Sequence, residues 1–177
     1  QINKFRSLSK EILTVYNNYG QNEAKQAAEI DDMKFMIRAV VDDLGFETER
    51  KSAKDVDDFI SQPGSPDSTR ATSLTSERKM DSTFRGEMLK QDDAIVSKKN
   101  YGDGAQGVLK QTADGKVTDM SRNLSSDQKS EVAVQQVSMF LANYNPNQEP
   151  KPGKIVVKGK DLEMAQKVYS ALLLFTK

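Results

Sequence analysis

Four lysines surround a short apolar run near the end of the chain, and they are the residues best placed to bind an anion: Lys151, Lys154, Lys158 and Lys160. A strand, a Gly-Lys turn and a helix N-terminus can hold a phosphate, because unpaired amides and the helix dipole favour an anion there. The phosphate-loop pattern needs Ser or Thr after Gly-Lys, but Asp161 follows here. Asp161 would cap the helix itself and repel a phosphate. We therefore expect an ordinary capped strand–helix unit, whose lysines keep an edge strand soluble.

Paired carboxylates are the second candidate for chemistry. Adjacent aspartates occur at 31–32, 42–43, 57–58 and 92–93, and such pairs can bind a divalent cation or act as acid and base. Neighbouring side chains on a helix diverge by about 100°, so these pairs suit a solvated face better than a shared ligand set. We predict no metal site, no catalytic residue and no cofactor.

The composition removes several kinds of catalysis. Cys, His and Trp are all absent, which excludes thiolate nucleophiles, disulfides, zinc sites built from Cys and His, and imidazole acid–base chemistry. Only carboxylates, Lys, Ser, Thr and Tyr remain as catalytic groups, and we predict a protein that is not an enzyme. The lack of Cys leaves two compartments open, the cytoplasm and export without disulfides.

Charge and hydropathy limit the partners. Lys plus Arg number 26 and Asp plus Glu number 26, so the formal net charge is zero. This balance disfavours a dedicated binder of nucleic acid or anionic membrane. The longest unbroken apolar run, Ala171–Phe175, is far shorter than the roughly 20 residues that span a bilayer. We predict no transmembrane segment.

Helical spacing dominates the first third of the chain. Apolar residues recur three and four positions apart over 2–19 and again over 22–44, which predicts two helices packed antiparallel. Ser52 and Asp55 have the spacing of a capping box and open a third, short helix. Pro63 ends it.

Residues 62–76 are rich in Pro, Gly, Ser and Thr and predict a flexible linker or loop. They divide the chain into an N-terminal helical region, 1–61, and a second region, 77–177, which we expect to share one core. The second region is expected to begin with a weak helix from about residue 76 to 99, since Gly86 lies inside it.

The rest of the chain shows clearer signals for turns and caps. Asp114-Gly115 is a strong hairpin turn signal and predicts a β-hairpin over 108–120. Ser125 opens a helix with capping-box spacing. A connector rich in proline then leads to a short strand at 154–158, and Asp161 caps the last helix.

The last helix, 161–176, is apolar on more than one face, so it must be covered on several sides. It is either a central core helix or part of an interface with another molecule. As candidate interaction residues we select three apolar side chains of this helix and three of the nearby lysines: Leu172, Leu173, Phe175, Lys154, Lys158 and Lys160.

These elements predict a mainly α fold with a small β component (α+β): an antiparallel helical bundle, with coiled-coil packing, a docked β-hairpin and a C-terminal strand–helix unit. Amphipathic helices at both ends of a polar, β-containing middle give a plan similar to that of bacterial secretion-filament and needle-tip proteins. The function we expect is that of a structural or interaction protein, a helical assembly or scaffold component that binds copies of itself or a protein partner. The alternative is a module that binds nucleic acid or another polyanion through the C-terminal lysines.

Overall fold

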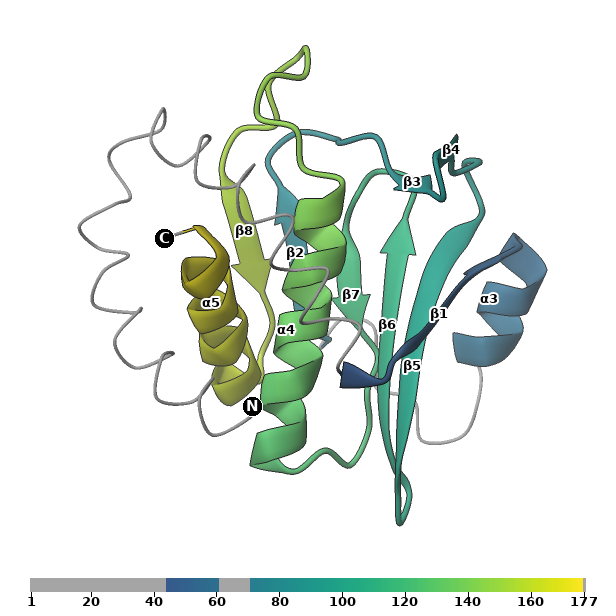
Figure 1. Cartoon of the computed structure of the whole chain (residues 1–177), viewed down its shortest axis with the longest axis vertical. Helices are drawn as coiled ribbons and strands as arrows, with labels where there is room; N and C mark the ends of the chain where they lie inside the picture. The colour runs from purple at the N-terminus through teal and green to yellow at the C-terminus, as the bar shows by residue number, and fades with distance from the viewer. Residues whose placement is uncertain (1–43, 61–70, 177) are drawn as a thin grey trace.

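A six-stranded antiparallel sheet is the largest element of the structure (Figure 1). The computed structural model describes residues 44–60 and 71–176. The strand order is β1-β5-β6-β7-β2-β8, with every neighbouring pair antiparallel. The strands of this sheet are β1 (Glu47–Lys51), β2 (Ser73–Ser76), β5 (Ala94–Gly102), β6 (Ala105–Thr112), β7 (Val117–Asp119) and β8 (Ile155–Lys158).

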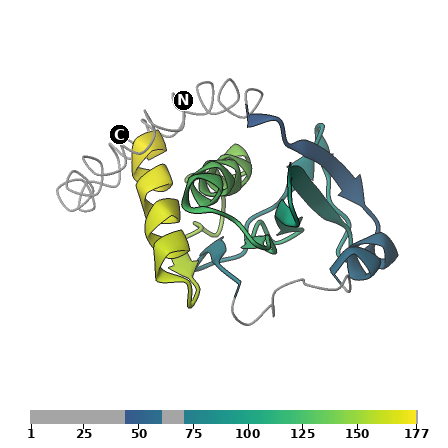
Figure 2. The same cartoon turned by 90° about the horizontal axis from the view of Figure 1, so that it is seen from below.

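Two long helices lie on one side of this sheet and a short one on the other. The sheet curves around α4 (Ser126–Ala142), and α5 (Leu162–Thr176) lies beside α4 (Figure 2). The short helix α3 (Ala53–Ile60) packs on the opposite side, where its Val56 meets Ala94 and Val96 of β5. A separate two-stranded ribbon, β3 (Thr83–Phe84) and β4 (Glu87–Met88), lies at one end.

The main core fills the space between the sheet and α4. Side chains alternate between the two faces of a strand, and Leu74, Leu109 and Val117 come from the face toward α4, where Val137 and Phe140 meet them. All five are fully buried. Each such side chain contributes roughly 1.5–3 kcal/mol by leaving water. Since α4 is buried along most of its length, it is the central helix of the described structure.

The predicted helical bundle is wrong, because the sheet and not helix packing organises the chain. The predicted helix over 76–99 is replaced by the end of β2, the β3–β4 ribbon and the start of β5. The apolar residues at 80, 84, 88 and 95 happen to lie at helical spacing, but Gly86 has a φ of 84° and turns the chain between β3 and β4. Coiled-coil packing is wrong for the same reason.

The predicted linker is also corrected in part. Residues 73–76 form β2, an inner strand with β7 on one side and β8 on the other. Residues 61–70, like the helix predicted over 2–19 and most of the one over 22–44, lie outside the described residues. The division of the chain into 1–61 and 77–177 therefore stays a prediction.

The turn and cap signals were more reliable. The Asp114-Gly115 turn is confirmed between β6 and β7, although the hairpin is part of the large sheet and is not a ribbon docked on helices. The capping box at Ser125 is confirmed, because its hydroxyl accepts from the backbone N–H of Gln128 while the Gln128 side chain accepts from the Ser125 N–H. Asp161 caps α5, since its Oδ1 accepts from the N–H of Met164 at 3.1 Å.

Candidate anion-binding face

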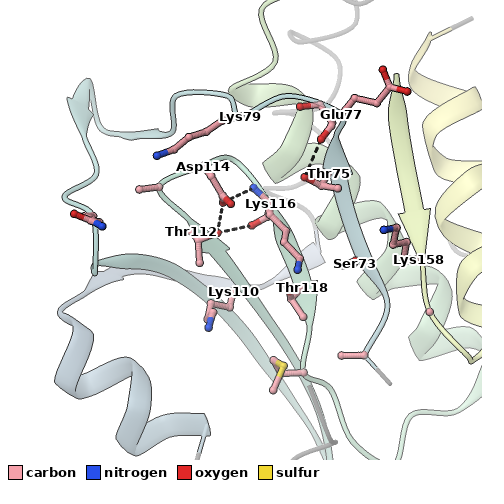
Figure 3. Close-up of a pocket in the computed structure, with 16 residues that line it drawn as sticks. Ser73, Thr75, Glu77, Lys79, Lys110, Thr112, Asp114, Lys116, Thr118 and Lys158 are labelled. Carbon is pink, nitrogen blue, oxygen red and sulfur yellow. Dashed lines mark hydrogen bonds between the residues drawn. The ribbon is translucent and has the colours of Figure 1, made fainter. Parts of the chain in front are cut away.

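The face of β6, β7, β2 and β8 that points away from α4 is hollowed and polar (Figure 3). The hollow has a volume of about 1020 Å³. We call this surface the open face and define it by six strand residues and four from the adjoining loops: Ser73, Thr75, Lys110, Thr112, Thr118 and Lys158, with Glu77, Lys79, Asp114 and Lys116.

Strand register brings four of these residues into one row across the sheet. Lys110 of β6 pairs with Thr118 of β7, Thr118 pairs with Ser73 of β2, and Ser73 pairs with Lys158 of β8. Neighbouring strands lie about 4.8 Å apart, so the two lysines of the row are separated by roughly 14 Å at the backbone. Two hydroxyl side chains thus lie between two lysines, which can fold over them from either end.

Two further lysines border this row. Lys116 belongs to the β6–β7 turn and Lys79 to the segment after β2 (Figure 3). Across the part of the chain that the structure describes, none of the ammonium groups of Lys79, Lys110, Lys116 and Lys158 makes an ion pair. Four cations therefore remain available to an anionic ligand.

Two acidic residues also line the hollow. Asp114 is held in place by its turn, since its Oδ1 accepts from the hydroxyl of Thr112 and from the backbone N–H of Lys116. Glu77 follows β2, and its exposed side chain points away from the lysines and lies close to Gly153 (Figure 3). With four lysines and two carboxylates, the open face has a formal charge of +2, and the described residues that line it include no aromatic side chain.

The predicted C-terminal lysines do not act together. Lys158 belongs to the row, but Lys154 and Lys160 are exposed outside the hollow. The three apolar candidates of α5, Leu172, Leu173 and Phe175, are only 5%, 3% and 3% exposed within this chain. The structure thus separates the six predicted interaction residues into one on the open face, two elsewhere on the surface and three in the interior.

A second charged cluster joins the N-terminal ends of α4 and α5. Lys129 pairs with Asp161 at 2.9 Å and Glu163 at 3.7 Å, and Lys167 pairs with Glu163 at 3.6 Å. The hydrogen bond to Asp161 raises the pKa of Lys129. Burial works to raise the pKa of Asp161, but the bonds from Lys129 and from the Met164 N–H outweigh it and lower that pKa, while the hydroxyl of Ser126 lowers the pKa of Glu163. These groups satisfy one another and fix the two helices together.

A third cluster lies between β5, which carries Lys99 and Tyr101, and α4, which carries Glu131. The ammonium of Lys99 contacts the carboxylate of Glu131 and the carbonyl of Leu44, and lies 5.1 Å from the centre of the Tyr101 ring. Burial raises the pKa of Tyr101, and the charge of Glu131 adds to the effect. Because a raised pKa keeps the phenol neutral, Tyr101 is poorly suited to act as a base or a nucleophile. We interpret this cluster as part of the core.

Within 44–60 and 71–176, no group of three or more acidic side chains is arranged to hold a metal ion. None of the described helices combines the length and the hydropathy of a membrane span. No protein-family model, curated protein or solved structure matches the chain.

Sequence reasoning missed most of that face. Lys110 and Lys116 both lie in the predicted hairpin, yet without a sheet to extend this hairpin there was no reason to place them near Lys158. Ser73 and Thr75 lay in a segment interpreted as a linker because of its Ser and Thr content. A usable but weak signal was Leu74 between Ser73 and Thr75, because apolar and polar side chains alternate along a strand that has one face on the core.

Proposed function

We propose that this protein is a binding protein, not an enzyme, and that its ligand surface for a polyanion is the open face. The row Lys110–Thr118–Ser73–Lys158 is the observation that carries the proposal. Ammonium groups without ion-pair partners attract anions, and adjacent hydroxyls can donate hydrogen bonds to the same groups. A polyanion is also the ligand that the C-terminal lysines suggest, but of those only Lys158 belongs to the open face.

Assembly through helix faces has less support. The burial of Leu172, Leu173 and Phe175 within the chain leaves them little surface to offer a partner. Self-association or binding of a protein partner through these residues remains a prediction.

The proposal is tested with two polyanions of unrelated backbone, heparin and inorganic polyphosphate, at low and rising salt. We expect retention at low ionic strength and a steep fall of affinity with salt, because lysines that bind a polyanion release the counterions condensed on it. The double variant Lys110→Gln/Lys158→Gln should bind at least about tenfold more weakly, and its salt dependence should be shallower by roughly one to two units of slope.

The matched control is Lys154→Gln/Lys160→Gln, which removes the same two charges from exposed lysines outside the hollow. It should retain most of the affinity. Equal loss in both double variants would show that net charge alone is responsible and would reject the open face. A lack of binding to either polyanion at low salt would reject the proposal as a whole.

A further inference from the structure

We infer that the ligand of the open face is an acidic polysaccharide, a polymer with both carboxylate and hydroxyl groups, and this inference rests on the proposed function. The alternative polyanion is a nucleic acid. The two differ in what they offer besides negative charge: a nucleic acid offers bases and a continuous phosphate backbone, whereas a polyuronate offers hydroxyl groups between its charges.

The first observation concerns the bases. Proteins that bind single-stranded nucleic acid stack the bases on aromatic side chains, and each stacked base contributes roughly 1–3 kcal/mol. The described residues that line the hollow include no aromatic side chain. A single strand would therefore be bound by its phosphates alone, with the bases left in water.

The second observation concerns the carboxylates. The Asp114 carboxylate lies in the same hollow as the lysines, whereas the Glu77 carboxylate points away from them (Figure 3). A carboxylate only accepts hydrogen bonds, so it repels a phosphate and receives nothing from it. The Oδ2 of Asp114 accepts no hydrogen bond from the described residues. A sugar hydroxyl can donate to this oxygen, while the carboxylates of the same polymer bind Lys110 and Lys158.

The third observation concerns the hydroxyl groups of the row. The hydroxyls of Ser73 and Thr118 have no hydrogen-bond partner among the described residues, and neither is sealed from solvent. A hydroxyl both donates and accepts, so it can pair with a sugar hydroxyl in either sense. The row thus has a lysine at each end and two free hydroxyls in its middle, and the Oδ2 of Asp114 is an acceptor beside it. This arrangement matches a polymer in which charged and neutral polar groups alternate.

The test compares an oligogalacturonate with an oligothymidylate of equal formal charge, at one ionic strength, by fluorescence anisotropy. We expect the oligogalacturonate to bind at least tenfold more tightly to the unmodified chain. Ser73→Ala/Thr118→Val should weaken oligogalacturonate binding several-fold more than oligothymidylate binding, because a phosphate only accepts from these hydroxyls whereas a sugar hydroxyl can also donate to them. Equal or tighter binding of the oligothymidylate would overturn the inference.

Asp114→Asn keeps Oδ1 as the acceptor for the Thr112 hydroxyl and the Lys116 N–H, but replaces Oδ2 with an amide group that only donates. The loss of one negative charge should favour both ligands alike, since they carry equal formal charge, whereas the acceptor for sugar hydroxyls is lost. The ratio of oligogalacturonate affinity to oligothymidylate affinity should therefore fall about two- to fivefold. Glu149→Gln, an exposed acidic residue outside the hollow, is the matched control. An unchanged affinity ratio would overturn the inference. If both ligands bind the unmodified chain equally and Lys110→Gln/Lys158→Gln binds neither of them, the inference fails while the proposed function stands. If Lys110→Gln/Lys158→Gln binds both ligands as the unmodified chain does, the proposed function fails too.

Discussion

Asp119, at the end of β7, is half-buried near the ion-pair cluster of α4 and α5. Burial raises its pKa to about 6 from 3.8, the charge of Asp161 adds to the rise, and hydrogen bonds from Ser121 and the charge of Lys129 oppose it. The folded state therefore binds this proton more tightly than the unfolded state, and the stability that the group contributes is lost as the pH rises from about 4 through 6. The cost at neutral pH reaches at most about 3 kcal/mol.

Asp119→Asn should abolish this cost, because the amide stays neutral and its oxygen can still accept from the Ser121 N–H, a bond of 2.9 Å. We expect the variant and the unmodified chain to be similar at pH 4 and the variant to be more stable at pH 7, measured as the free energy of unfolding in urea. Only the difference in unfolding free energy between the variant and the unmodified chain is informative. The reason is that Asp161 and Glu163 have lowered pKa values and favour the stability of both proteins at higher pH. Asp92→Asn, in an exposed loop, is the control. A difference that is constant over this range would contradict the assignment.

At the scale of elements, the β6–β7 turn positions Asp114 and Lys116 of the open face, and Gly115 makes this turn possible. Its φ is +89°, and a Cβ there would lie 3.0 Å from the Cβ and Cε of buried Met80. Gly115→Ala should therefore combine backbone strain with a clash and cost clearly more than 1 kcal/mol. Gly86→Ala is the matched control, since Gly86 has a similar φ of +84° with no atom within 4 Å of its added Cβ. Urea unfolding should show the larger loss at Gly115; an equal loss would mean that Met80 moves aside without cost.

The elements also show which parts of the fold were predictable. Turns and caps depend on a few adjacent residues, so Asp114-Gly115, Ser125 and Asp161 were recognised from local chemistry. The sheet depends on pairing between distant segments, such as β2 with β8 or β1 with β5, and short apolar runs fit helix or strand equally well. The candidate site was less predictable still: of its lysine row only Lys158 was selected, because the row exists only once the register of four strands is known.

At the scale of the whole molecule, one core joins the sheet to both long helices. The residues of this core and the residues of the proposed binding surface are different. Apolar side chains of α4 and α5 pack against each other and the sheet, whereas four lysines that make no ion pair with the described residues line the face that these helices leave uncovered. A partner that binds the open face therefore does not need to disturb the core. Helix-mediated assembly would instead require exposed apolar surface on α5.

Leu172→Glu tests whether α5 is a core helix or an interface helix. Leu172 is 5% exposed and part of the main core. A buried carboxylate there should lower the free energy of unfolding by roughly 3–5 kcal/mol, because packing is lost and a charge is desolvated. This loss is a large part of the 5–15 kcal/mol that is the usual free energy of unfolding of a domain. Leu162→Glu is the matched control, because Leu162 lies on the same helix and is 70% exposed; it should change stability by less than about 0.5 kcal/mol. We expect urea unfolding to show a large loss for Leu172→Glu at every protein concentration, with light scattering showing no concentration-dependent step that the unmodified chain lacks. If Leu172→Glu stays folded and only dissociates a complex that the unmodified chain forms, α5 is an interface helix and the prediction of helix-mediated assembly gains direct support.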